Sequence, residues 1–256
     1  MKTKNIYSIF ILVALFLSFC LKAGFALNSY ETSAFNRANV YYEQANYDEA
    51  IKQYSSVLES GYESGNLFYN LGNCYFKKGE LGRAILNYEK ARRLIPKDLD
   101  LESNYEYACS LVKGQTVVSK KSLLLGALNN LFEKFTINGL TILLSLLYIL
   151  ILVNILISLF FKQFKKYVLM LIVFMGVFFI TCFIGLNSKR AFLNKEAIIL
   201  AEQVDAKFEP IDKATTYFTL YAGMKIEVIE SRDNWYKIKR QDDKAGWVQN
   251  GALAIY

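Results

Sequence analysis

The sequence contains no histidine among its 256 residues. This absence excludes Ser-His-Asp and Cys-His sites, in which an imidazole activates the nucleophile. It also removes the most common zinc and iron ligand of proteins. Few hydrolase or metalloenzyme mechanisms remain. We therefore predict a protein that is not an enzyme, with no catalytic residue, no metal ligand and no cofactor.

Cysteine is scarce, and the four cysteines form no C-x-x-C motif. Cys20 and Cys182 lie in apolar segments, whereas Cys74 and Cys109 lie in the first polar part of the chain. If that part is exported, a disulfide between Cys74 and Cys109 is one interpretation. The other is a pair of thiols that pack between helices. A thiol-redox function through these two residues is an alternative hypothesis.

Positive charge is confined to a few segments, although the whole chain carries a net charge of +7. Residues 27–113 hold 10 basic and 12 acidic side chains, and residues 191–256 hold 9 and 10. The excess lies in residues 1–26 and 114–190, where Lys and Arg flank apolar runs and can meet lipid phosphates. The folded parts are slightly acidic, so we predict no nucleic-acid binding.

Charged residues are absent from two apolar runs, residues 137–161 and 167–186. A helix needs about 20 apolar residues to cross the hydrocarbon core of a membrane, and these runs supply 25 and 20. A helix in a soluble domain would show a polar stripe. Only residues 162–166, three of them lysines, separate the runs. We predict two transmembrane helices joined by a cytoplasmic turn, with both flanking domains on one side of the membrane.

Residues 1–26 have the parts of a signal peptide in the expected order. Lys2 and Lys4 precede an apolar stretch, and Gly24 and Ala26 supply small residues before a cleavage site. The segment is either cleaved or retained as an anchor. In both cases it sends the following domain across the membrane, which fixes the predicted topology more firmly than the loop charges do.

A period of 34 residues runs from residue 33 to residue 96. Small residues recur where paired helices approach, and Tyr and Leu recur at helical spacing. The recurring pairs include Tyr41 and Tyr75, Ala50 and Ala84, and Tyr54 and Tyr88. The pattern resembles the tetratricopeptide repeat, which implies a helical solenoid with a concave binding face. We predict a domain at 27–113, with repeats at about 31–64 and 65–98 and a capping helix at 98–113.

Four side chains are candidates for partner binding in the concave face of the repeats, by their position in the repeat: Asn39, Tyr42, Asn73 and Phe76. The resemblance implies that paired asparagines grip the backbone of a bound peptide. The alternative is that all four are ordinary solvated or packing residues.

Residues 114–136 begin polar and continue with leucines at helical spacing, such as Leu124, Leu128 and Leu131. Next to a predicted span, this pattern favours a linker with a helix in the lipid interface, or a helical leader into the span. Asn154, inside the first run, can hydrogen-bond another membrane helix. We therefore expect other membrane proteins among the partners.

After residue 186 the pattern changes to short β-branched or aromatic segments separated by turn signals. Five or six strands in residues 191–256 predict a small all-β barrel. Gly223, then Trp235 with Ile238, then Trp247 between Gly and Val resemble the signature of a bacterial SH3 domain. Four aromatic side chains are candidates for a peptide or glycan groove, the alternative being barrel packing: Tyr217, Tyr221, Trp235 and Trp247.

The whole chain resembles the BatE-type proteins of bacterial aerotolerance operons. An export signal, tetratricopeptide repeats, a membrane hairpin and an SH3-like domain follow one another in the same order. The resemblance implies the bacterial cytoplasmic (inner) membrane, with both folded domains on the periplasmic, extracytoplasmic side. It also implies partner proteins, namely von Willebrand factor A-domain proteins and a MoxR-type ATPase. The expected role is envelope integrity or tolerance of oxidative stress.

The predicted fold class is a multidomain membrane protein with an α-helical tetratricopeptide-repeat solenoid, two transmembrane helices and a C-terminal all-β SH3-like barrel. We expect a scaffold or adaptor that binds protein partners through both domains and uses the lipid bilayer as its anchor. Tethering of this kind raises the effective concentration of partners to ~mM. One alternative makes the SH3-like domain a peptidoglycan-binding module, and the other is the thiol-redox function.

Overall fold

The computed structural model of the chain describes residues 29–114, 135–160, 165–193 and 195–256. The predicted signal peptide and most of the predicted linker or interfacial helix lie outside the described residues. Contacts divide the chain into two compact units, residues 1–62 and residues 63–256. Each unit is described by itself.

The described residues of the first unit form one helical hairpin, which consists of α2 (Ser29–Glu43) and α3 (Tyr47–Glu59). Asn46 caps α3, because its side-chain oxygen accepts a hydrogen bond from a backbone nitrogen of the first turn at 3.4 Å. Ala38 and Ala50 are fully buried. Their small side chains let the two helices approach closely.

The second unit begins with three helices, α4 (Gly65–Lys77), α5 (Leu81–Leu94) and α6 (Leu99–Ser110). The side chains of Ser64 and Asp98 cap α4 and α6, accepting hydrogen bonds from backbone nitrogens at 3.2 and 2.9 Å. The start of α5 follows the start of α3 by 34 residues, which agrees with the period read from the sequence. α6 lies within the segment predicted as a capping helix.

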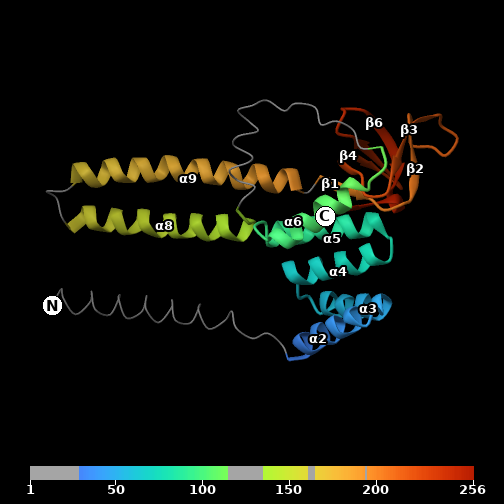
Figure 1. Ribbon diagram of the computed structural model, residues 1–256. Coiled ribbons are helices and arrows are strands. Elements are labelled where there is room, and N and C mark those ends of the chain that lie inside the picture. The colour runs from blue at the N-terminus through green and yellow to red at the C-terminus, as the bar shows by residue number, and fades with distance from the viewer. Residues whose placement is uncertain (1–28, 115–134, 161–164, 194) are drawn as a thin grey trace. The chain divides into compact units, whose positions relative to one another are not determined.

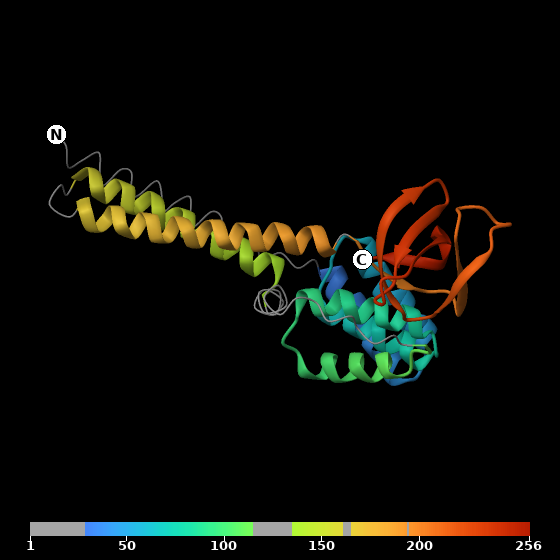
Figure 2. The same ribbon diagram turned by 90° about the horizontal axis from the view of Figure 1, so that it is seen from above.

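Two long apolar helices, α8 (Ile137–Phe160) and α9 (Lys165–Leu193), lie side by side and antiparallel (Figures 1 and 2). Each contains a stretch that is long and apolar enough to cross a membrane, 20 residues in α8 and 22 in α9. One buried cluster joins the helices, and it consists of Leu140, Leu144, Cys182 and Leu186.

Three polar side chains within this hairpin donate hydrogen bonds to the helix that carries them, and Asn154 Nδ2 of α8 also lies 4.0 Å from Met175 Sδ of α9. Ser145, Asn154 and Thr181 each donate to the carbonyl oxygen four residues earlier at 2.9 Å. Such bonds matter in hydrocarbon, where an unsatisfied polar group is costly. α9 extends beyond the expected second span at both ends. Its last residue, Leu193, stands three positions before the first strand.

The C-terminal part is one antiparallel sheet with the strand order β3-β2-β6-β5-β4-β1-β7. The strands are β1 (Glu196–Ile199), β2 (Gln203–Lys207), β3 (Thr216–Tyr221), β4 (Lys225–Arg232), β5 (Trp235–Lys239), β6 (Ala245–Gln249) and β7 (Leu253–Ile255). The prediction of a barrel is wrong about closure, because among the described strands β3 and β7 stand at opposite edges and do not pair. β7 is only three residues long, and it pairs with β1 alone.

One face of the sheet forms the core of this domain. Alternation along the strands directs every second side chain to that face. The core side chains are at most 3% exposed, and they include Ala206, Leu220, Ile226, Ile238 and Val248. The other face carries Trp235, Lys237 and Trp247, which alternate with these residues on β5 and β6.

The substitution Gly72→Ala tests the close approach of α4 and α5. An added Cβ would lie 2.5 Å from the ring of Tyr88, and overpacking of this kind costs about 1–3 kcal/mol. We expect a lower unfolding temperature of the detergent-solubilised full chain, measured by circular dichroism. Gly176→Ala in α9 is the control, because there an added Cβ meets no neighbouring described atom within 4 Å. Equal unfolding temperatures for the two variants would contradict the packing.

Candidate functional site

The two candidate asparagines make equivalent hydrogen bonds in the two repeats. Tyr54 donates its hydroxyl proton to Asn39 Oδ1 at 2.5 Å, and Tyr88 donates to Asn73 Oδ1 at 2.7 Å. Each bond joins the first helix of a repeat to the second. The side-chain oxygens of Asn39 and Asn73 therefore tie the repeat together, in addition to any contact with a partner.

Asn73 belongs to a polar row that runs from α4 to α6. Asn104 Nδ2 donates to Asn73 Oδ1 at 3.2 Å and to the Tyr69 hydroxyl at 2.8 Å. An aromatic pair continues the row, because the ring centroids of Phe76 and Tyr107 are 5.7 Å apart. Tyr107 is 59% exposed. The face shared by α4 and α6 thus offers amide groups beside accessible aromatic rings.

Tyr42 lies in α2 of the first unit, and its ring centroid is 5.6 Å from that of Tyr47. Asn39 and Tyr42 belong to the first unit, whereas Asn73 and Phe76 belong to the second. A single groove that combines all four side chains stays a prediction.

The two candidate tryptophans share the face of the sheet opposite to the core. Opposed residues of antiparallel strands point to the same face. Trp247 of β6 stands opposite Lys207 of β2 and Lys237 of β5, and Trp235 stands two residues before Lys237. Trp235 is half-buried, whereas Trp247 is only 6% exposed.

Cations surround these tryptophans. Lys207 Nζ lies 5.8 Å from the ring centroid of Trp235. The Arg232 guanidinium carbon and Lys237 Nζ lie 5.5 and 5.7 Å from the ring centroid of Trp247. Cation–π attraction of this kind is strongest over Trp. Glu230 lies 3.5 Å from Arg232 Nη2 and 3.9 Å from Lys237 Nζ, so part of this positive charge is compensated. The surface combines aromatic rings with the remaining positive charge, which suits a ligand that has both a stacking face and an anionic group.

The two candidate tyrosines of the sheet lie apart from each other. Tyr217 is 42% exposed, and its ring centroid is 4.5 Å from that of Phe208. Tyr221 pairs with Gln203 of β2. Gln203 lies four residues before Lys207 on the same strand, which is a separation of roughly 13 Å at 3.3 Å per residue. The structure thus brings the tryptophans together and separates Tyr221 from them.

A further surface was not predicted from the sequence, namely the contact between α5 and the sheet. A Cβ on Gly82 of α5 would lie 2.6 Å from the carbonyl oxygen of Ile199, and one on Gly223 would lie 2.7 Å from Ile85 Cδ1. Gly223 also has a φ of +86°, which favours glycine. All four residues of β1 are buried, because the core covers one face of the strand and α5 covers the other.

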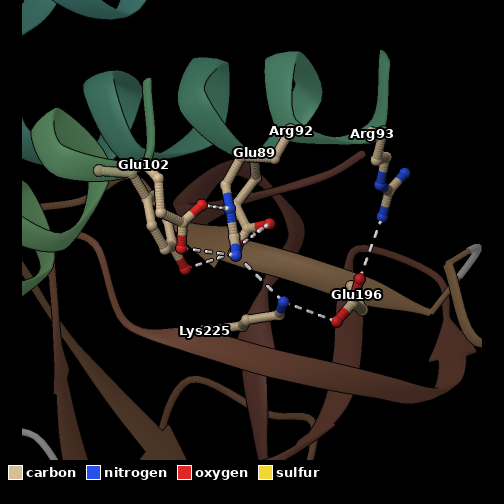
Figure 3. A network of polar contacts seen from close by, with 7 residues as sticks. Glu89, Arg92, Arg93, Glu102, Glu196 and Lys225 are labelled. Carbon is tan, nitrogen blue, oxygen red and sulfur yellow. Dashed lines mark hydrogen bonds and ion pairs between the residues drawn. The ribbon is translucent and has the colours of Figure 1, made fainter. Parts of the chain in front are cut away.

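Opposite charges bridge the same contact (Figure 3). Lys225 Nζ of β4 lies 3.2 Å from Glu89 Oε1 of α5 and 2.8 Å from Glu196 Oε1 of β1. Arg93 Nη2 of α5 donates to Glu196 Oε2 at 3.2 Å. The chain therefore holds Lys225 between two carboxylates, one from the repeat and one from the sheet.

The surroundings of Glu89 and Lys225 keep both charged. Burial raises the pKa of Glu89. The charge of Lys225, the hydrogen bond donated by Tyr105 and the charge of Arg92 together outweigh this effect of burial, so the pKa of Glu89 lies below its ordinary value. Tyr105 donates that hydrogen bond at 2.6 Å. Burial lowers the pKa of Lys225, but Glu89 above all raises it, so the pKa lies above its ordinary value. Sequence reasoning missed these residues, because charges on a helix and a strand read as ordinary solvated positions.

In the part of the chain that the structure describes, Cys74 and Cys109 are thiols and do not form a disulfide. Burial raises the pKa of the Cys74 thiol from 9.0 to about 12. Burial also raises the pKa of Cys109. The thiolate is the reactive form in redox exchange. These pKa shifts disfavour the thiol-redox hypothesis and favour helix packing.

Comparison with known families supports the two domain resemblances. Residues 35–98 match the tetratricopeptide repeat, and residues 210–254 match the bacterial SH3 domain. No curated protein matches the chain. Both domain types point to protein partners, and the SH3 domain also to peptidoglycan. Both are typically non-catalytic.

The thiol of Cys74 gives a prediction with a defined pH dependence. At pH 8 a thiol with a pKa of 12 is about 10⁻⁴ ionised, against about 10⁻¹ for a pKa of 9. We expect iodoacetamide to alkylate Cys74 about 1000-fold more slowly in the folded protein than in urea, as measured by peptide mass spectrometry. The raised pKa stabilises the fold below pH 9.0, and this contribution is lost as the pH rises toward 12. Fast alkylation of folded protein at pH 8 would restore the redox hypothesis.

Proposed function

We propose that this chain is a non-enzymatic, membrane-anchored adaptor that binds protein partners at the membrane surface. The observation that carries the proposal is the contact of α5 with β1 and β4. α5 precedes the two apolar helices in the sequence and the sheet follows them. The ion pairs of Lys225 with Glu89 and of Arg93 with Glu196 support the placement of both parts in one aqueous compartment. Two membrane crossings between them are consistent with this placement.

The compartment follows from the N-terminal segment. Residues 1–26 read as a signal peptide, so the repeat domain crosses the membrane and the turn of the hairpin stays in the cytoplasm. With this topology both folded domains are on the periplasmic side. The membrane-spanning role of α8 and α9 rests on their length and apolar composition.

The face shared by α4 and α6 is the proposed partner site of the second unit. Asn73 Oδ1 and Asn104 Nδ2 are engaged within the fold, so Asn73 Nδ2 and Asn104 Oδ1 are the atoms proposed to hydrogen-bond an extended backbone. Phe76 with Tyr107 provides an apolar end. Asn39 and Tyr42 are the proposed partner-binding residues of the first unit. The resemblance to BatE-type proteins supports membrane-anchored von Willebrand factor A-domain proteins and a MoxR-type ATPase as partners, in an aerotolerance or envelope-stress complex.

Site-specific photocrosslinking in cells tests the partner site. A photoreactive phenylalanine in place of Tyr107, which is 59% exposed, should capture one defined protein. The same residue in place of Arg83, which is exposed on α5 with a side chain 55% accessible, is the control. We expect capture from position 107 only, reduced at least tenfold when Phe76→Ala is added. Identical products from both positions, or none from position 107, would reject the α4–α6 face as the site.

The cationic tryptophan surface supports a second candidate function, the binding of peptidoglycan. This polymer offers sugar faces for stacking on an aromatic ring and carboxylates for pairing with Lys207, Arg232 or Lys237. Trp235 is the ring that a ligand reaches, because Trp247 is only 6% exposed. Stacking of this kind contributes about 1 kcal/mol or more per ring.

The substitutions Trp235→Ala and Trp247→Ala separate binding from folding in this surface. We expect Trp235→Ala to lower retention of the detergent-solubilised full chain on purified sacculi at least fivefold without changing its unfolding temperature. Trp247→Ala should instead destabilise the sheet by about 3–5 kcal/mol, as loss of a buried aromatic does. If wild-type chain is not retained on sacculi, or if Trp235→Ala is retained equally well, the peptidoglycan hypothesis fails.

A further inference from the structure

The loop between β2 and β3 is tied to the end of the sheet that carries Trp235. Gln249 of β6 stands opposite Trp235 of β5, so both side chains point to the outer face of the sheet. Gln249 Nε2 donates a hydrogen bond to Asp212 Oδ1 of the loop at 2.9 Å. Lys207 Nζ, which lies 5.8 Å from the ring centroid of Trp235, donates to the main-chain oxygen of Asp212. These hydrogen bonds hold Asp212 at the Trp235 end of the outer face.

The loop itself is braced by backbone hydrogen bonds. The backbone nitrogen of Phe208 donates to the carbonyl oxygen of Thr215 at 3.2 Å, and that of Ala214 donates to the carbonyl oxygen of Ile211 at 3.1 Å. Ordering of a loop is one of the costs of binding, and a loop that is already ordered avoids it. The fold therefore presents the carboxylate of Asp212 in a fixed position.

The pair of Asp212 and Gln249 leaves hydrogen-bonding groups open to a ligand. Both side chains are exposed. Asp212 Oδ2 and Gln249 Oε1 accept no hydrogen bond from another described residue, and Gln249 Nε2 has a second N–H to donate. The border of the Trp235 ring thus offers both acceptors and a donor. The hydroxyl and acetamido groups around a pyranose ring supply the matching donors and acceptors, and the apolar face of such a ring stacks on an indole.

Charge is balanced at the Trp235 end of the outer face. Lys207 contacts Asp212, so a cation and an anion meet there. Arg232 stands opposite Trp235 in the sheet, but its guanidinium carbon lies 5.5 Å from the ring centroid of Trp247. The Trp235 end therefore suits an uncharged group, whereas the Trp247 end suits an anion.

An extended peptide would find no main-chain partners at Trp235. Peptides that bind a sheet through their backbone add a strand to an exposed edge. Trp235 lies in β5, which pairs with β4 on one side and with β6 on the other. Recognition at this point must therefore come from side chains. A sugar ring is recognised in this way, through stacking and side-chain hydrogen bonds.

We propose that Trp235, Gln249 and Asp212 form a subsite for one uncharged sugar ring of a glycan strand. The indole stacks on the apolar face of the sugar, and the amide and carboxylate hydrogen-bond its hydroxyl or acetamido groups. This inference rests on the second proposed function, the binding of peptidoglycan. It assigns the Trp235 end of the outer face to the glycan and leaves the carboxylates of the stem peptide to the cations at Trp247.

Chitotetraose, a linear tetramer of N-acetylglucosamine, tests the subsite because it carries neither charge nor peptide. The full chain in nanodiscs is titrated with this probe, and emission of its two tryptophans reports binding. We expect a saturable change of emission in wild type. Gln249→Ala should raise the dissociation constant about fivefold, which is the effect of one lost hydrogen bond between neutral groups.

Asp212→Asn separates recognition from bracing of the loop. Asparagine keeps a side-chain oxygen for the hydrogen bond from Gln249, but it replaces the second acceptor with a donor. We expect the dissociation constant of chitotetraose to rise at least fivefold, with an unchanged unfolding temperature. Lys213→Ala, at the next and equally exposed position of the loop, is the control and should bind like wild type.

The results also distinguish the subsite from the peptidoglycan function. Unchanged emission of wild type with chitotetraose, or equal dissociation constants for wild type, Gln249→Ala and Asp212→Asn, would overturn the subsite. Retention on sacculi that the free stem peptide competes away, and chitotetraose does not, would support peptidoglycan binding and reject the sugar subsite. Binding of chitotetraose that both substitutions weaken, without retention on sacculi, would support the subsite and reject peptidoglycan as its ligand.

Discussion

Pairing of buried charge across a long stretch of sequence is the constraint on which this structure depends. Arg93 and Glu196 are 103 positions apart, and Glu89 and Lys225 are 136 apart. Two apolar helices of membrane-spanning length lie between the members of each pair. A carboxylate as buried as Glu89 must have a cation beside it. The pairing thus brings together residues that precede and follow both apolar helices.

The network is balanced rather than strongly stabilising. Its acidic members are Glu89, Glu102 and Glu196, and its basic members are Arg92, Arg93 and Lys225. Loss of one member leaves a partner buried and unpaired, which costs more than the intact pair contributes. Gly82 and Gly223 allow α5 and the sheet to approach closely, since side chains at these two positions would hold the two segments apart. Charge sets the orientation and glycine sets the distance.

Periodic features were predictable from the sequence, whereas contacts between distant segments were not. The repeat helices and the two apolar helices follow from spacing and composition, which are local properties. β2 was not predicted as a strand, because three of the five residues in its sequence, QVDAK, are polar. The sequence predicted a partner-binding role for Asn39 and Asn73, but it did not predict their role within the repeats. There, their side-chain oxygens accept hydrogen bonds from Tyr54 and Tyr88. Gly82 looked like an ordinary weak helix position, because only the folded sheet gives it a neighbour.

The contact also divides the available surfaces. In the second repeat α5 faces the sheet, so a partner of this repeat is left with the α4–α6 face, where Tyr107 and Phe76 meet. The outer face of the sheet is divided in the same way. Its β1 end packs on α5. The end formed by β2, β6 and β5 carries the tryptophans with Lys207 and Lys237, and Arg232 approaches Trp247 from β4. Because the two proposed binding surfaces are separate from the α5 contact, neither proposed ligand would have to displace α5 from the sheet in order to bind.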